Sequence, residues 1–130
     1  MNTKKTFIYL IVLVVVAIGI GFAVSGAERK PAKYDEFAQC LKDNGAVFYG
    51  AFWCPHCQAQ KKLFGRSAKL LPYVECSTAD GKNQLPICKD KKIESYPTWE
   101  LKDGTRLETE NAAGVTFETL SEKTQCPLPQ

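Results

Sequence analysis

Two cysteines separated by two residues, Cys54 and Cys57, lie where a strand-like segment changes into a helix-like one. The preceding segment 46–52, AVFYGAF, is apolar and aromatic, as expected of a buried strand. The following segment 58–64, QAQKKLF, consists largely of good helix formers. Pro55 suits the first turn of a helix, where its missing N–H removes no hydrogen bond. The sequence therefore predicts a strand-to-helix junction with Cys54 at the helix N-terminus.

The start of a helix favours an anionic sulfur at Cys54. Unpaired backbone N–H groups and the positive end of the helix dipole stabilise a thiolate there. Cys57 lies three residues later on the same face, within reach of a disulfide. We expect Cys54 to be the nucleophile and Cys57 the resolving cysteine, with Trp53, Pro55 and His56 tuning the pair. A cationic His56 stabilises the thiolate further, which makes the disulfide more oxidising.

Later motifs complete a recognisable pattern. Strand-like residues 98–101, an Asp103–Gly104 turn and residues 106–109 predict a hairpin. A family resemblance is carried by segments 48–57 (FYGAFWCPHC), 62–65 (KLFG), 73–76 (YVEC) and 95–99 (SYPTW). On these segments the chain resembles the thioredoxin-like domain that is fused to, or partnered with, bacterial and plant vitamin K epoxide reductase homologues. The resemblance implies an α/β thioredoxin-like fold, with a central mixed sheet of about four strands flanked by helices.

The resemblance also implies a function. Such a domain is a thiol–disulfide oxidoreductase that oxidises thiols of exported proteins and passes electrons to a quinone-coupled vitamin K epoxide reductase-like membrane protein, here acting in trans. Its redox-active disulfide needs no cofactor. A cis-proline at Pro97, with Tyr96 and Thr98, is expected to face the cysteine pair and the substrate. Phe48 stands where thioredoxins carry a buried acid, which favours an oxidase over a reductase.

The other four cysteines leave their pairing open, because six cysteines allow 15 connectivities. Cys76 and Cys88 flank a loop, and we expect either a structural disulfide or, as the resemblance permits, a second redox pair that shuttles electrons. Cys40 and Cys126 remain, and a bridge between the two ends of the domain is expected by elimination. Free buried thiols are the alternative.

Residues 7–24, FIYLIVLVVVAIGIGFAV, form an uncharged apolar run preceded by Lys4 and Lys5. As a helix at about 1.5 Å per residue the run reaches roughly 27 Å, close to a bilayer core of about 30 Å. The lysines favour a cytoplasmic N-terminus, with the remainder outside the cytoplasm, in a periplasm, a lumen or the cell exterior. We expect a transmembrane anchor or a cleaved signal peptide at 1–26, a linker at 27–33 and the thioredoxin-like domain at 34–130.

Other chemistries fit less well. Residues 31–130 contain 13 basic and 13 acidic residues, so no excess positive charge is available for nucleic acid. No second close cysteine pair completes a zinc site, so no metal is expected. His56 cannot face Cys54 from two residues away on a helix, which excludes a Cys–His protease. The remaining alternatives are a membrane-anchored disulfide reductase or isomerase and, in a different class, an exported copper-binding carrier. Lys61 and Lys62 are expected on a solvated helix face.

Overall fold

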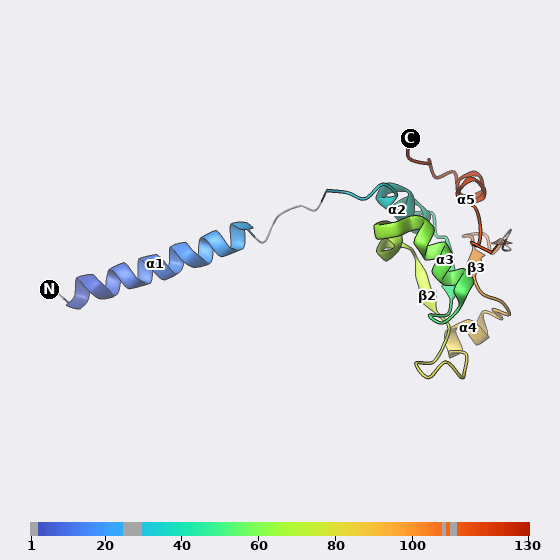
Figure 1. Ribbon diagram of the computed structural model, residues 1–130, viewed down its shortest axis with the longest axis horizontal. Helices are drawn as coiled ribbons and strands as arrows, with labels where there is room; N and C mark the ends of the chain where they lie inside the picture. Colours follow the sequence, from blue (N-terminus) through green and yellow to red (C-terminus); the bar gives the residue numbers. More distant parts are fainter. Residues whose placement is uncertain (1–2, 25–29, 108, 110–111) are drawn as a thin grey trace. The chain divides into compact units, whose positions relative to one another are not determined.

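Four short strands form a mixed sheet in the order β2–β1–β3–β4, of which Figure 1 labels β2 and β3. The central strand β1 (Val47–Gly50) pairs in parallel with β2 (Tyr73–Glu75) and antiparallel with β3 (Thr98–Glu100). The predicted hairpin joins β3 to β4 (Arg106–Leu107), and Gly104 adopts a positive φ of 85° in its turn. The computed structural model describes residues 3–24, 30–107, 109 and 112–130, with the backbone alone for 17 and 19–24.

The chain divides into two units, residues 1–30 and 31–130. In the first unit, helix α1 runs from Thr3 to Val24. Within the portions of the chain that the structure describes, no helix has both the length and the apolar character that crossing a membrane requires, so the expected transmembrane helix is not found. Residues 25–26 of the expected anchor or signal peptide, residues 27–29 of the expected linker, and Glu108 of the expected hairpin lie outside the described residues.

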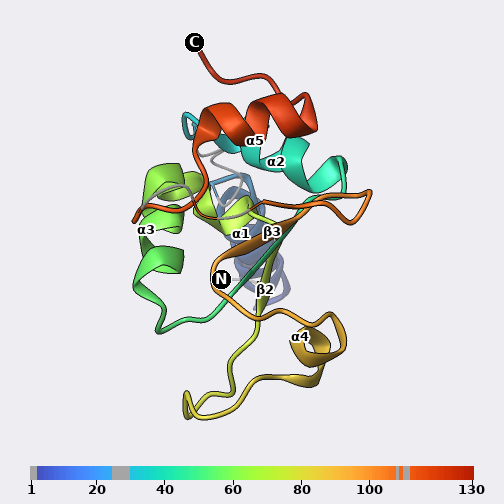
Figure 2. The ribbon, with the colours of Figure 1, turned by 90° about the vertical axis from the view of Figure 1, so that its right-hand side faces the viewer.

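Helices surround the sheet in the second unit. Helix α2 (Asp35–Asp43) and helix α5 (Phe117–Thr124) lie side by side at one end of the domain (Figure 2). Helix α3 (Pro55–Phe64) follows β1 and continues into the 3-10 helix η1 (Gly65–Leu70). The short helix α4 (Pro86–Asp90) lies at the opposite end from α5 (Figures 1 and 2). The expected α/β architecture with a four-stranded mixed sheet is therefore confirmed.

Aromatic side chains fill the core between these elements. Phe48 of β1 stacks on Trp99 of β3 with ring centroids 4.9 Å apart. A second group of rings joins the helices: the Phe64 and Phe117 centroids are 4.6 Å apart, and Phe37 contacts both rings, at 5.9 Å and 5.6 Å. Phe52 is different from expectation: it lies after β1 has ended and is 49% exposed. The apolar pattern of 46–52 does not show where the strand gives way to the loop.

Candidate functional site

The end of β1 and the start of α3 place the cysteine pair. Cys54 is the N-cap of α3, with an extended backbone (φ −71°, ψ 120°), and Pro55 is the first helical residue. The Cys54 carbonyl accepts the first helical hydrogen bond, from the Gln58 N–H at 3.1 Å. The cysteine sulfur therefore lies at the end of the helix where unpaired N–H groups and the dipole favour negative charge. This is the placement that the sequence predicts.

The loop before β3 faces Cys54. The Tyr96–Pro97 peptide bond is cis, and the Cys54 Sγ lies 3.6 Å from the Tyr96 carbonyl oxygen, to which the thiol donates. Thr98 does not reach outward: its hydroxyl donates to the Ser95 carbonyl at 2.8 Å and its side chain is buried. Tyr96 and Pro97 thus lie beside the reactive sulfur, and Thr98 holds the loop in shape.

Cys57 lies beneath the surface and differs chemically from its partner. It is 1% exposed and packs against Gly50 of β1, where an added β-carbon would stand 2.8 Å from the Cys57 Sγ. Burial raises the pKa of the Cys57 thiol to about 12, and the neighbouring Cys54 contributes. Cys57 is therefore protonated at neutral pH.

Alkylation of the reduced protein tests this difference. We expect iodoacetamide to modify Cys54 and leave Cys57 unmodified below about pH 9, its ordinary pKa, with reaction at Cys57 beginning as the pH approaches about 12. Because burial favours the neutral thiol, Cys57 stabilises the reduced fold fully below about pH 9, and this stabilisation is lost as the pH rises through about 12. Peptide mapping by mass spectrometry measures the labelling. Equal labelling of Cys54 and Cys57 at pH 7 contradicts the predicted difference between them.

A charged cluster that the sequence did not reveal lies beside Cys57. Lys61, one helical turn after Cys57, places its ammonium 3.2 Å from the centroid of the Tyr73 ring. The Tyr73 hydroxyl donates to Glu75 at 2.7 Å, and the other Glu75 oxygen accepts from the backbone of Phe52 and Ser77. Lys61 is half-buried, so its expected placement on a solvated face is wrong.

The electrostatics of this cluster bear on proton movement at Cys57. Burial lowers the pKa of Lys61, although Glu75 and Cys57 oppose the shift. Burial and the Glu75 carboxylate raise the pKa of Tyr73, which therefore stays a neutral donor. Although Phe48 replaces the buried acid of thioredoxins, α3 and β2 supply charged groups here instead. The signal in the sequence was the i, i+4 spacing of Cys57 and Lys61; Tyr73 and Glu75 are brought beside them by the parallel pairing of β2 with β1, which the fold decides.

Exposed aromatic side chains border the reactive sulfur. Trp53 is 49% exposed, and its indole N–H donates to the Ser77 hydroxyl at 2.9 Å. Its ring meets the Tyr96 ring edge-on at 6.1 Å. The loop after β2 passes close by, since a β-carbon at Gly81 would lie 3.6 Å from Trp53. Trp53 therefore lies at the surface rather than in the core.

The remaining cysteines form two disulfides. Cys40 is bonded to Cys126 and Cys76 to Cys88, which agrees with the expected pairs. Both sulfurs of the second bond are buried, with 0% of either residue exposed. A thiolate cannot attack a sulfur that it cannot reach, so the structure favours the structural role for Cys76–Cys88 over the shuttle. The bond anchors the base of the loop that carries Ser77 and Gly81.

Replacing both Cys76 and Cys88 by serine tests the structural role. The residues are 12 apart in sequence, so loop-closure entropy predicts a loss of about 3 kcal/mol in the free energy of unfolding. We expect the rate of disulfide exchange at Cys54, corrected for the folded fraction, to stay within about twofold because the pair itself is untouched. Urea unfolding and stopped-flow exchange measure the two quantities. A large loss of exchange rate in folded protein favours the shuttle.

His56 is exposed and held by a distant loop. Its Nδ1 lies 2.8 Å from the Ala112 carbonyl oxygen. A carbonyl only accepts, so Nδ1 carries a hydrogen and donates it. His56 is the second residue of α3, two residues after Cys54, and its Nδ1–H is directed to the Ala112 carbonyl.

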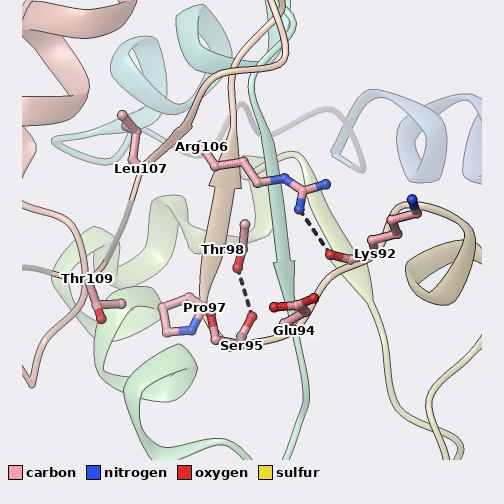
Figure 3. A pocket seen from close by; sticks show the side chains of 8 residues that line it. All are labelled: Lys92, Glu94, Ser95, Pro97, Thr98, Arg106, Leu107 and Thr109. Carbon is pink, nitrogen blue, oxygen red and sulfur yellow. Dashed lines mark hydrogen bonds between the residues drawn. The ribbon is translucent and has the colours of Figure 1, made fainter.

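A cavity of about 630 Å³ opens beside the cis-proline loop (Figure 3). Pro97 and Ser95 form one wall, and Arg106 spans from β4 towards the preceding loop. The Arg106 guanidinium donates to the carbonyls of Lys91 and Lys92 and to Glu100. These contacts tie the chain before Pro97 to the hairpin on which the cavity is built. Within the described residues, no cluster of three or more His, Cys, Asp or Glu side chains has the arrangement of a metal site.

Comparisons with known proteins agree with this geometry. The chain is 49% identical over 70 residues to the thiol-disulfide oxidoreductase LTO1 of Arabidopsis thaliana, a match that covers 51% of this chain and 19% of that protein. It is 27% identical over 103 residues to the protein disulfide isomerase-like 5-1 of Oryza sativa subsp. japonica, covering 75% of this chain and 68% of that protein. Residues 27–125 match the family Thioredoxin. With this match and the cysteine pair set against a cis-proline, the chain belongs to the thioredoxin family.

Proposed function

We propose that this chain is a thiol–disulfide oxidoreductase that oxidises the thiols of exported proteins. The family match and the names of both relatives support thiol–disulfide exchange as the activity. One observation carries the proposal: Cys54 begins α3 with its sulfur 3.6 Å from the Tyr96 carbonyl, and Cys57 lies three residues further along the helix, packed against Gly50 of β1. The incoming thiolate is therefore expected to attack the sulfur at the helix start, on the side of the cis-proline loop.

The exchange then runs in two steps. A substrate thiolate attacks the Cys54 Sγ, the Cys54–Cys57 bond breaks, and Cys57 leaves with the electron pair and takes up a proton. The raised pKa of Cys57 favours that protonation. A second substrate thiolate attacks the substrate sulfur of the mixed disulfide, and Cys54 leaves as a thiolate at the helix start. The substrate loses two electrons and gains a disulfide, and the cysteine pair is left reduced.

The proposed direction, oxidation of substrate thiols, depends on the groups that stabilise the reduced form of the Cys54–Cys57 pair. A thiolate favoured by the start of α3, and by a cationic His56 nearby, makes the disulfide a stronger oxidant. Titration of the Cys54–Cys57 couple against glutathione tests the direction. A reduction potential between about −120 and −200 mV supports an oxidase, whereas a value of about −270 mV is that of a reducing thioredoxin.

We propose that the domain works outside the cytoplasm. The two disulfides support this location because such bonds persist in oxidising compartments, and the apolar run at 7–24 after Lys4 and Lys5 supports export. Fractionation of cells, with thiol-reactive probes that do not cross membranes, tests it. Labelling of Cys54 only after lysis contradicts the proposal.

The electron acceptor that we propose is a quinone-coupled membrane protein like vitamin K epoxide reductase, acting in trans. The support is the resemblance of segments 48–57, 62–65, 73–76 and 95–99 to domains associated with that protein. Reduced chain mixed with such a protein and a quinone is expected to regain its Cys54–Cys57 disulfide faster than with quinone alone. Equal rates with and without the membrane protein rule out this partner.

A second candidate is a disulfide isomerase, which the rice relative's name favours. An isomerase must attack a wrong disulfide from its reduced state, so it gains from a pair that is easily kept reduced. Refolding of a scrambled multi-disulfide protein separates the two functions. Reshuffling without added oxidant supports the isomerase, and net disulfide formation at the expense of Cys54–Cys57 supports the oxidase.

A further inference from the structure

Two side chains of α3, one helical turn apart, fasten the chain at 112–115 to the helix of the active site. His56 and Gln60 are four residues apart and therefore project from the same face. His56 binds the Ala112 carbonyl, and Gln60 binds Val115. The loop is distant in sequence, and the chemistry described above assigns no role to Gln60.

Gln60 forms the more rigid of the two attachments. Its side chain is 0% exposed, its amide nitrogen donates to the Val115 carbonyl at 3.1 Å, and its oxygen accepts from the Val115 N–H at 2.7 Å. Gly114 has a φ of 103°, and a β-carbon there would overlap the Gln60 amide. Both backbone groups of Val115 are thus satisfied by one buried side chain, which fixes the height of the loop along α3.

The position of the loop decides how His56 is held. The Ala112 carbonyl, three residues before Val115, accepts from the His56 Nδ1 at 2.8 Å. This contact selects the Nδ1–H form of the neutral ring and strengthens when the ring is cationic, because charge-assisted hydrogen bonds are the stronger ones. Without the carbonyl, the exposed imidazole has no fixed orientation from its own helix.

We propose that Gln60 is a positioning residue that sets the redox poise of Cys54–Cys57 through the Ala112 carbonyl and His56. When the ring is cationic, the Ala112 carbonyl holds its charge in the first turn of α3, where it adds to the positive potential that stabilises the Cys54 thiolate. Stabilising the thiolate stabilises the reduced pair and makes the disulfide more oxidising. The proposal rests on the thiol–disulfide exchange proposed above, but the couple's potential and the tautomer of His56 are measurable whatever the substrate.

A double-mutant cycle tests the coupling. Gln60→Met keeps the length of the side chain and removes both hydrogen bonds. We expect it to shift the equilibrium of the pair with glutathione about threefold towards the disulfide, the effect of weakening one hydrogen bond at an exposed charge. In a His56→Ala background the same change is expected to have no effect on the equilibrium. A shift of equal size with and without His56 overturns the proposal.

Two further measurements separate positioning from stability. Thr116→Val removes the cap of α5, where the Thr116 hydroxyl accepts from the Thr119 N–H at 3.2 Å. It is expected to lower the melting temperature without moving the glutathione equilibrium. In the unmodified protein, ¹⁵N chemical shifts of the neutral His56 ring are expected to show hydrogen on Nδ1. This measurement needs no variant, and a ring with its hydrogen on Nε2 overturns the proposal even if Gln60→Met does not fold.

Discussion

Cys54→Ser is expected to reduce the rate of substrate thiol oxidation by about a thousandfold or more, to the level of uncatalysed exchange. The hydroxyl of serine forms no disulfide with Cys57, so the couple disappears altogether. The fold is expected to remain, because the substitution exchanges one atom in a side chain that is the N-cap of α3, a position where serine is a favoured residue. Oxidation of a model dithiol peptide, followed by loss of free thiol, measures the rate.

Cys57→Ser is the matched variant, and its expected result is different. Cys54 keeps its thiolate environment and remains able to attack a disulfide, but the buried partner that resolves the mixed disulfide is gone. Reduced Cys57→Ser protein is therefore expected to accumulate a mixed disulfide at Cys54, visible as an adduct on non-reducing gels. If Cys57→Ser remains active and Cys54→Ser accumulates the adduct, the assignment of the two roles is reversed.

Removing the Cys40–Cys126 disulfide is expected to produce the largest loss of stability of any substitution considered. The cysteines are 86 residues apart, so the bond closes most of the domain and loop-closure entropy predicts a contribution of about 4–5 kcal/mol. A domain of this size is stable by only about 5–15 kcal/mol, so the double variant Cys40→Ser/Cys126→Ser is expected to be marginally folded. Urea unfolding of the oxidised protein and the variant measures the difference.

The Cys76→Ser/Cys88→Ser variant is the control for that measurement. Its bond closes a shorter loop, with a sequence separation of 12 between the cysteines against 86, so its expected loss of about 3 kcal/mol is the smaller of the two. The reverse order contradicts the entropic account. It would instead place the main stabilising contacts in the cluster of Tyr49, Ile93 and the two buried sulfurs of Cys76–Cys88.

Where local chemistry determines local structure, the sequence was sufficient. The apolar run ending before Cys54, the proline after it and the helix formers beyond predict the junction that the structure contains. The hairpin at 98–107 follows in the same way from its Asp–Gly turn. Helix α2 buries Phe37, Ala38 and Leu41, whose spacing in the sequence places them on one helix face. Each of these depends on residues that are neighbours in the chain.

Two predictions failed because burial is not a local property. Phe52 continues an apolar pattern and yet is exposed, since β1 ends at Gly50 and the chain turns towards the helix. Lys61 is charged and yet half-buried, because the ring of Tyr73 lies beneath its ammonium. Hydrophobic and charged residue types give the average tendency of a side chain, whereas the contacts made by a particular one depend on which strand pairs with which.

By itself the sequence determined that a nucleophilic sulfur stands at the start of a helix with a second cysteine one turn on, because the potential at a helix end arises from the helix itself. Tertiary structure alone decided what surrounds these sulfurs. The Tyr96 carbonyl, the Lys61–Tyr73–Glu75 cluster and the loop held by Gln60 arrive from segments that are remote in sequence. Their hydrogen bonds and burial depend on sheet order and packing, and these arise only when distant parts of the chain compete to exclude water from one core.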